Sequence, residues 1–99
     1  MYGDISLQSA KSALAANPNI KLIDVRRPEE YRKGHIANSI NVPLDSIRSI
    51  KNIVANKNDT IFVYCQSGSR GLQAKDDLVR MGYTNVTFIG GVQGWRLVH

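Results

Sequence analysis

Short runs of residues that favour strands alternate with segments of helical periodicity along this chain, and this alternation limits the folds it can adopt. The expected strands are short and rich in apolar or β-branched residues, and they cover residues 21–25, 39–42, 60–64 and 86–89. Strands that alternate with helices pair in parallel and are joined by right-handed crossovers. The sequence therefore predicts an α/β fold with a central, mostly parallel sheet of four to five strands and helices on both faces.

The segments between these strands carry the periodicity and the end signals of helices. Helices are expected over residues 6–16, over residues 28–34, from residue 43 onward and over residues 70–81. Ser6 is the expected N-cap of the first helix. The inward-facing residues of the helix over residues 70–81 are expected to be Leu72, Ala74, Leu78 and Met81. Gly90 and Gly91 are expected to turn the chain into a short final helix that carries Trp95.

Length and composition limit the class of protein. At 99 residues the chain has room for one hydrophobic core, so a single domain over residues 1–99 is expected. Hydrophobic residues make up 42% and charged residues 21%, which excludes disorder as the default. No apolar run approaches the ~20 residues that span a bilayer, and the N-terminus has no signal-peptide pattern. A cytoplasmic location without membrane association is therefore expected.

The charge balance bears on the partners. The chain has 13 basic and 8 acidic residues, a formal net charge of +5. The basic residues are spread along the sequence, and Glu29 and Glu30 interrupt the densest cluster, residues 26–33. Nucleic-acid-binding proteins show a basic stripe with interleaved aromatic residues, so no nucleic-acid partner is expected. The excess charge is expected mainly on solvated surface, with a small anionic ligand as the alternative.

Cys65 is the only cysteine, which excludes an internal disulfide and a metal site made of several cysteines. It directly follows the strand expected over residues 60–64 and opens a turn before a helix. Ligands of parallel α/β folds bind at the carboxyl ends of the strands. The first N–H groups of a helix favour a thiolate over a thiol. Cys65 is therefore predicted to be a nucleophile, and the alternative is a small buried hydrophobic residue.

The turn after Cys65 is suited to hold an anion over the sulfur. Gly68 allows the backbone to curl without a Cβ clash, and the two serines add hydroxyl donors. Arg70 supplies a planar guanidinium that suits an oxyanion. The predicted anion-binding residues are Gln66, Ser67, Gly68, Ser69 and Arg70.

Three motifs in this order resemble those of the single-domain rhodanese family of sulfurtransferases. The first, LIDVRRPEEYRKGHIANSINVP over residues 22–43, is similar to the family pattern D-V-R-x-x-x-E-[FY]-x-x-G-H-I-x-x-[AS]-x-N-[IV]-P. The second is CQSGSR over residues 65–70, and the third is GGVQGW over residues 90–95, similar to the closing pattern G-G-x-x-x-W. The resemblance covers nearly the whole chain and implies a rhodanese-like fold.

The resemblance implies a sulfurtransferase that works in two steps. Cys65 would take a sulfane sulfur from thiosulfate, a polysulfide or a thiol persulfide and become a persulfide, cradled by the backbone N–H groups of residues 66–70. The sulfur would then pass to a thiophilic acceptor, either cyanide or a thiol. No metal or organic cofactor is implied. The implied partners are a small anionic sulfur donor, such an acceptor and, as an alternative, a sulfur-relay protein.

Two features of the loop bear on its substrate. Four residues separate Cys65 from Arg70, one fewer than in the related tyrosine-phosphatase-type loops, so sulfur is favoured over the larger phosphoryl or arsenate group. Many family members carry Arg directly after the cysteine, where this chain has Gln66. One loop cation in place of two predicts weaker attraction for dianionic thiosulfate and favours a thiol-bound persulfide. A relay or interaction module and an inactive regulatory domain are rival hypotheses; retention of Cys65 argues against the second.

Other residues are expected to have structural roles. Asp24 is expected to hold a turn and Arg26 to pair with Glu29 or Glu30, with a place in the pocket as the alternative. His35 is expected to fix a turn through hydrogen bonds. The residues expected to pack in the core or to allow close backbone contact beneath the loop are Tyr31, Tyr64, Trp95, Gly90 and Gly91.

Overall fold

A computed structural model describes residues 3–66 and 69–99 of the chain. Its central sheet has four strands in the order β3-β1-β4-β5, and all neighbouring pairs are parallel. The strands are β1 (Lys21–Asp24), β3 (Ile40–Asn41), β4 (Ile61–Cys65) and β5 (Val86–Gly91). The predicted α/β class and mostly parallel sheet are confirmed.

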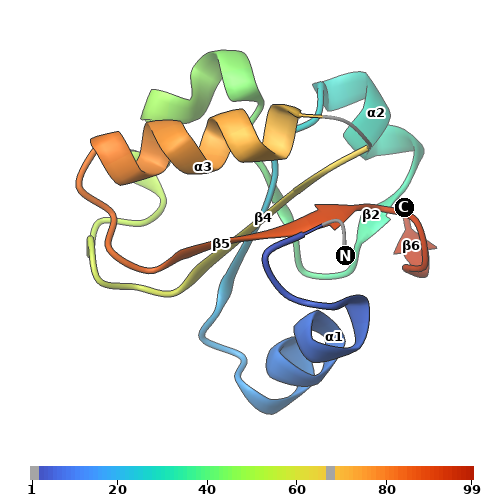
Figure 1. The fold of residues 1–99 in the computed structure, drawn as a ribbon. Coiled ribbons are helices and arrows are strands. Elements are labelled where there is room, and N and C mark those ends of the chain that lie inside the picture. Colours follow the sequence, from blue (N-terminus) through green and yellow to red (C-terminus); the bar gives the residue numbers. More distant parts are fainter. Residues whose placement is uncertain (1–2, 67–68) are drawn as a thin grey trace.

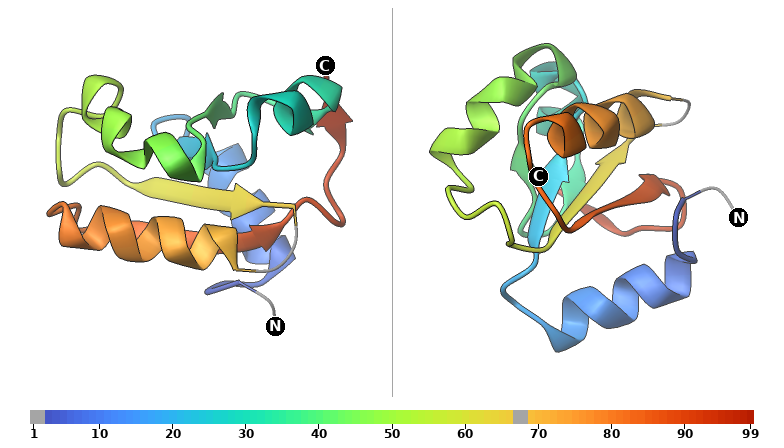
Figure 2. Two further views of the ribbon diagram at one scale, coloured as in Figure 1. Left: turned by 90° about the horizontal axis from the view of Figure 1, so that it is seen from above. Right: turned by 60° about the vertical axis from the view of Figure 1, so that its left-hand side comes forward.

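Helices cover both faces of this sheet, as predicted. The helix α3 (Arg70–Arg80) and the 3-10 helix η1 (Leu44–Asn52) lie on one face, and α1 (Leu7–Ala16) lies on the other (Figures 1 and 2). The short helix α2 (Pro28–Lys33) follows β1 at the edge where the strands end (Figure 1). This arrangement places the helices that follow β1 and β4 around one edge of the sheet.

The ends of α1 and α2 follow from local chemistry. The Ser6 hydroxyl accepts the Ser9 N–H at 3.0 Å, which confirms Ser6 as the N-cap of α1. Proline opens α2, two glutamates occupy its first turn, and Arg32 and Lys33 occupy its last turn. These charges complement the helix dipole at both ends. Gly34 follows as the C-cap of α2.

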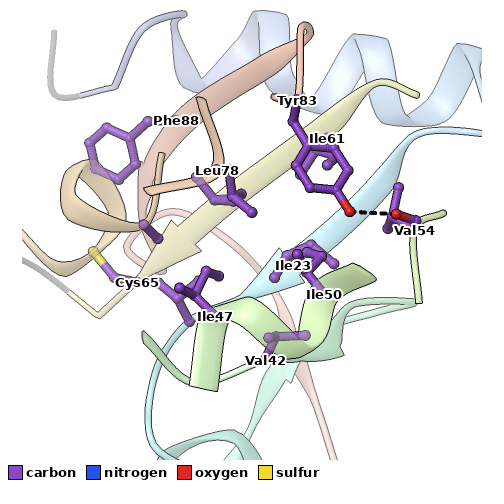
Figure 3. Close-up of a cluster of buried hydrophobic side chains, with 13 residues drawn as sticks. Ile23, Val42, Ile47, Ile50, Val54, Ile61, Cys65, Leu78, Tyr83 and Phe88 are labelled. Atoms are coloured by element: carbon purple, nitrogen blue, oxygen red, sulfur yellow. Dashed lines mark hydrogen bonds between the residues drawn. The ribbon is translucent and has the colours of Figure 1, made fainter. Parts of the chain in front are cut away.

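Two apolar clusters pack on opposite faces of the sheet because neighbouring residues of a strand point to opposite sides. The cluster beneath α3 and η1 is shown in Figure 3 and includes Ile23, Val42, Ile47, Ile50, Ile61, Val63, Leu78 and Phe88. Within it the Tyr83 hydroxyl donates to the Val54 carbonyl at 2.5 Å. The cluster beneath α1 includes Ala10, Leu22, Ile36, Phe62, Tyr64, Ile89 and Val92.

The N-terminal segment covers the edge strand β5. The Asp4 N–H donates to the Phe88 carbonyl at 2.7 Å, and the Asp4 carboxylate accepts the Phe88 N–H at 2.9 Å. The same carboxylate pairs with Lys75 of α3 at 2.6 Å. An exposed sheet edge is a template for unwanted strand pairing, so these bonds protect the edge as well as tying the N-terminus to the fold.

Two expectations about the elements are wrong. The segment after β5 forms no helix; it turns and ends in β6 (Leu97–Val98), which pairs antiparallel with β2 (His35–Ile36). Leu72 points outward with 46% of its surface exposed, because the smaller Gly71 occupies the core-facing position against the Phe88 ring. The helix expected from residue 43 onward is confirmed as η1, a 3-10 helix over residues 44–52 with a kink at Ser46.

The lengths and compositions of the helices show whether any of them could cross a membrane. Among the described residues, no helix is both long enough and apolar enough to cross a membrane. The cytoplasmic location stays a prediction.

Candidate active site

Cys65 is the last residue of β4, at the carboxyl edge of the sheet. It pairs with Gly91 of β5 after a register shift between Val63 and Cys65. Its side chain is fully buried at one end of the cluster beneath α3 (Figure 3). The predicted position of Cys65 at the carboxyl end of this strand is confirmed, and pairing with β5 extends the strand one residue beyond the expected range, through Cys65 itself. The sulfur therefore lies at a strand end that is held by the core.

Gly91 lies against the backbone that leaves Cys65. A Cβ built on Gly91 would be 2.4 Å from the Gln66 carbonyl oxygen, far inside contact distance. Only glycine allows this approach without a shift of the loop. The expected close backbone contact beneath the loop is therefore confirmed for Gly91.

A buried ion pair lies beside the start of the loop. The Arg26 guanidinium donates from Nε and Nη2 to the Asp24 carboxylate, with a shortest distance of 2.7 Å, and both residues are almost completely buried. Burial disfavours the charged Arg26, but the hydrogen bonds and charge of Asp24 outweigh it, so its pKa is raised. Asp24 also accepts the Arg26 N–H at 2.9 Å, which confirms that it holds the turn.

The partner predicted for Arg26 is wrong, since it pairs with Asp24 and not with a glutamate of α2. Its remaining donors fix two further segments. Nη2 donates to the Gly34 carbonyl at 2.7 Å, and Nη1 donates to the Gln66 side-chain oxygen at 3.1 Å. Gln66 thus offers a neutral acceptor to the buried guanidinium.

A second ion pair holds the other end of the loop. Arg70, the first residue of α3, donates from Nη1 and Nη2 to the two carboxylate oxygens of Glu30, at 2.7 and 3.0 Å. The hydrogen bonds to Arg70 lower the pKa of Glu30 to about 2. The same contact, with a smaller contribution from the nearby Cys65, raises the pKa of Arg70. The Arg70 guanidinium, which was expected to face an oxyanion, thus binds the Glu30 carboxylate.

Residues of the first motif therefore hold both ends of the loop. Arg26 holds Gln66, and Glu30 holds Arg70; each contact joins positions 40 residues apart in the sequence. Glu30 is a site residue that the sequence reasoning missed. Its position in the motif, as the glutamate of D-V-R-x-x-x-E, is the signal that could have identified it.

Two surface depressions of about 190 Å³ border these ion pairs. The first is lined by Arg26, Glu30, Lys33, Gly34, Gln66 and Leu97. The second is lined by Val25, Arg27, Pro43, Leu44, Asp45 and Arg70. Arg26 therefore also lines a pocket, as its alternative role requires. Each depression is lined by two basic side chains and one acidic side chain.

The remaining predicted loop residues are less informative. Ser67 and Gly68 lie outside the described residues. Ser69 is the N-cap residue of α3, is exposed, and makes no side-chain capping hydrogen bond. The cradle of backbone N–H groups over residues 66–70 stays a prediction. Among the described residues, no group of three or more His, Cys, Asp and Glu side chains could hold a metal ion.

Most of the residues that were expected to have structural roles make structural contacts. His35 Nδ1 lies 2.8 Å from the Tyr31 carbonyl oxygen, and its ring stacks on that of Tyr31, as the expected turn requires. Tyr64 is fully buried, and its hydroxyl accepts the Ile36 N–H at 3.1 Å and bonds Ser39 Oγ at 2.9 Å. Trp95 packs on the cluster beneath α1.

The same motifs and fold occur in known proteins. The model of the rhodanese-like domain family matches residues 6–97. The chain belongs to the rhodanese-like domain family. A rhodanese structure from Escherichia coli, solved with anions, has 41% sequence identity and a TM-score of 0.73, covering 80% of this chain and 96% of that one. A rhodanese-related protein from Thermoplasma volcanium has 29% identity and a TM-score of 0.79, covering 98% of each chain. The recognition of the family from its motifs is confirmed.

Curated relatives of this rhodanese-like chain handle sulfur. It is 46% identical over 72 residues to the thiosulfate sulfurtransferase PspE of Escherichia coli. This match covers 72% of this chain and 69% of PspE. It is 31% identical over 93 residues to the putative sulfur carrier protein YrkF of Bacillus subtilis, which covers 93% of this chain. The chain spans only half the length of YrkF. Sulfur transfer, as an enzyme or within a relay, is thus the general activity of these relatives.

Proposed function

We propose that this rhodanese-like protein is a sulfurtransferase in which Cys65 carries the transferred sulfur as a persulfide. The observation that carries the proposal is the position of Cys65. It ends the central strand β4, and a short loop joins it to Arg70 at the start of α3. Its identity as the only cysteine of the chain leaves no other thiol for the reaction.

The first step is attack of the Cys65 thiolate on the outer sulfur of a donor. With thiosulfate, a new S–S bond forms at Cys65, the S–S bond of the donor breaks, and sulfite leaves with the bonding electron pair. The N-terminus of α3, which begins at Arg70, carries a partial positive charge that favours the anionic persulfide electrostatically. The relative solved with anions and the thiosulfate sulfurtransferase PspE support an anionic donor.

The second step returns the enzyme to its starting state. A thiolate or cyanide attacks the terminal sulfur of the persulfide, the S–S bond at Cys65 breaks, and the Cys65 thiolate leaves. The products are an acceptor persulfide or thiocyanate. Each half-reaction transfers one sulfur atom without net oxidation, so the proposed mechanism uses no metal or organic cofactor.

A second candidate is a relay in which partner proteins supply and remove the sulfur. The similarity to YrkF, a putative sulfur carrier protein of which this chain covers half, favours it. In the relay the Cys65 chemistry is the same, and the donor is a protein persulfide. Slow turnover with small donors, together with fast transfer from a partner persulfide, would distinguish the relay from a free-standing enzyme.

Steady-state kinetics test the proposal. Thiocyanate formation from thiosulfate and cyanide should follow double-displacement kinetics, with parallel double-reciprocal lines. Cys65→Ser should reduce the rate to that of the uncatalysed reaction. Because Cys65 is buried among apolar side chains, Cys65→Ala serves as the second variant, and circular dichroism establishes that each variant is folded. A folded Cys65 variant that retains turnover would contradict the proposal.

A further inference from the structure

The bidentate contact between Glu30 and Arg70 bears on donor selectivity. Both Nη atoms of Arg70 contact carboxylate oxygens of Glu30, at 2.7 and 3.0 Å. This paired geometry is also the one with which a guanidinium binds a sulfur or phosphorus oxyanion. Glu30 therefore occupies two of the five N–H donors of the loop cation, the terminal pair suited to bidentate binding of an oxyanion such as thiosulfate.

Glu30 is itself fixed in place. Its Oε1 accepts the Arg27 N–H at 3.0 Å, so the carboxylate is anchored to the start of α2 as well as to Arg70. About a quarter of the Glu30 side chain and 30% of the Arg70 side chain are exposed, so the pair borders the solvent from which a donor arrives. The carboxylate is thus a permanent negative charge beside the site.

The other guanidinium next to the loop is neutralised as well, because Arg26 pairs with buried Asp24. The two ion pairs neutralise both guanidiniums that contact the loop, and the other charged residues that line the two depressions are Lys33, Arg27 and Asp45. Coulomb energy scales with the charge of the ligand, so an unpaired cation would attract a dianion about twice as strongly as a monoanion. Pairing each cation with a carboxylate reduces this advantage of the dianion.

We propose that Glu30 is a specificity-determining residue, which neutralises Arg70 and shifts the preference of Cys65 from dianionic donors toward sulfur donors of lower charge. This inference rests on the proposed sulfur transfer at Cys65. The favoured class is a monoanionic or thiol-bound sulfane sulfur. Thiosulfate remains a substrate, with a smaller advantage from its second charge.

Two donors of different charge test this inference with cyanide as the common acceptor. Thiosulfate is a dianion and methanethiosulfonate is a monoanion, and both present a terminal sulfane sulfur on an oxidised sulfur. Glu30→Gln keeps the shape of the side chain and a neutral acceptor for Arg70. At low ionic strength it should raise kcat/KM about tenfold for thiosulfate and about threefold for methanethiosulfonate, the effect of one charge several ångströms away. The ratio of the two should therefore rise about threefold.

Two control variants separate charge from structure. Glu29→Gln removes the same charge from the exposed neighbouring position of α2 and should leave the ratio of the two donors near that of the wild type. Glu30→Asp keeps the charge but shortens the side chain, so it should also keep the wild-type ratio even where both rates fall. Added salt should reduce the effect of Glu30→Gln.

The outcomes distinguish the inference from the function on which it rests. An unchanged ratio in Glu30→Gln, an equal loss with both donors, or an equal rise in Glu29→Gln would overturn the role of Glu30 and leave sulfur transfer intact. A wild-type protein that turns over neither donor and gains no sulfur from either would overturn the proposed function together with the inference.

Discussion

Gly91 brings the backbone of β5 into contact with the loop that follows Cys65. Its α-carbon faces the Gln66 carbonyl so closely that a Cβ would lie 2.4 Å from that oxygen. The backbone of both segments is held by strand pairing, since Cys65 pairs with Gly91. One added methyl group is therefore expected to move the loop rather than to be absorbed by a flexible side chain.

Gly91→Ala is predicted to reduce both sulfur transfer and stability. We expect kcat/KM to fall at least about tenfold, with an overpacking cost of about 1–3 kcal/mol in the free energy of unfolding. Gly82→Ala is the matched control: Gly82 has a φ of +100° and open space around its Cβ position. It should lose about 1 kcal/mol through backbone strain and keep wild-type kinetics. Full activity in Gly91→Ala would contradict the contact.

Tyr64 joins β4 to the end of β2 and to the loop before β3 through its buried hydroxyl, which accepts the Ile36 N–H and bonds Ser39 Oγ. Tyr64→Phe leaves both partners buried without this oxygen and should lower the free energy of unfolding by about 1–3 kcal/mol. Tyr83→Phe loses a single bond, to the Val54 carbonyl, and should cost about 1 kcal/mol. Denaturant unfolding measures the loss in unfolding free energy of each variant. A loss for Tyr64→Phe that is equal to or smaller than that for Tyr83→Phe would contradict the role of the Tyr64 hydroxyl.

At the scale of elements, the contact between Glu30 of α2 and Arg70 of α3 is expected to make the stability of the fold depend on pH. Arg70 holds the pKa of Glu30 at about 2, below its ordinary value of 4.5. A lowered pKa in the folded state adds stability above the ordinary pKa, and this stability is lost as pH falls toward the lowered value.

The difference in unfolding free energy between the wild type and Glu30→Gln should therefore depend on pH. It should be about 1–3 kcal/mol near pH 6, reduced by partial solvent exposure, and should shrink through the window from about pH 4.5 to about pH 2. Denaturant titrations across that range provide the measurement. A difference that stays constant from pH 6 to the acid end would mean that the Glu30 carboxylate is not held by Arg70.

Local patterns predicted the elements well where each element carries its own signal. The strands, α1 with its Ser6 cap and the helix after the loop follow from periodicity and end residues. The final helix was wrong because Gly90 and Gly94 adopt positive φ angles and Leu97 pairs with Ile36, a contact that no local window contains. Leu72 was wrong because a glycine, which carries no hydrophobic signal, fills the core-facing position of α3.

At the scale of the whole molecule, parallel pairing of β1 with β4 brings two distant segments to one edge. The sequence predicted Cys65 at this edge because the carboxyl end of a parallel strand is where ligands bind. It did not predict which charges would meet there. The pairs of Arg26 with Gln66 and of Arg70 with Glu30 depend on the helices that follow each strand, and no spacing within either segment encodes them.

The most direct test of the account is the intact mass of the protein after incubation with thiosulfate and removal of the donor. We expect a gain of one sulfur atom in the wild type, none in Cys65→Ser or Cys65→Ala, and loss of the added sulfur on treatment with cyanide, with one thiocyanate released per chain. A wild-type mass that stays unchanged with both thiosulfate and glutathione persulfide, or a gain that persists in a Cys65 variant, would contradict persulfide formation at Cys65.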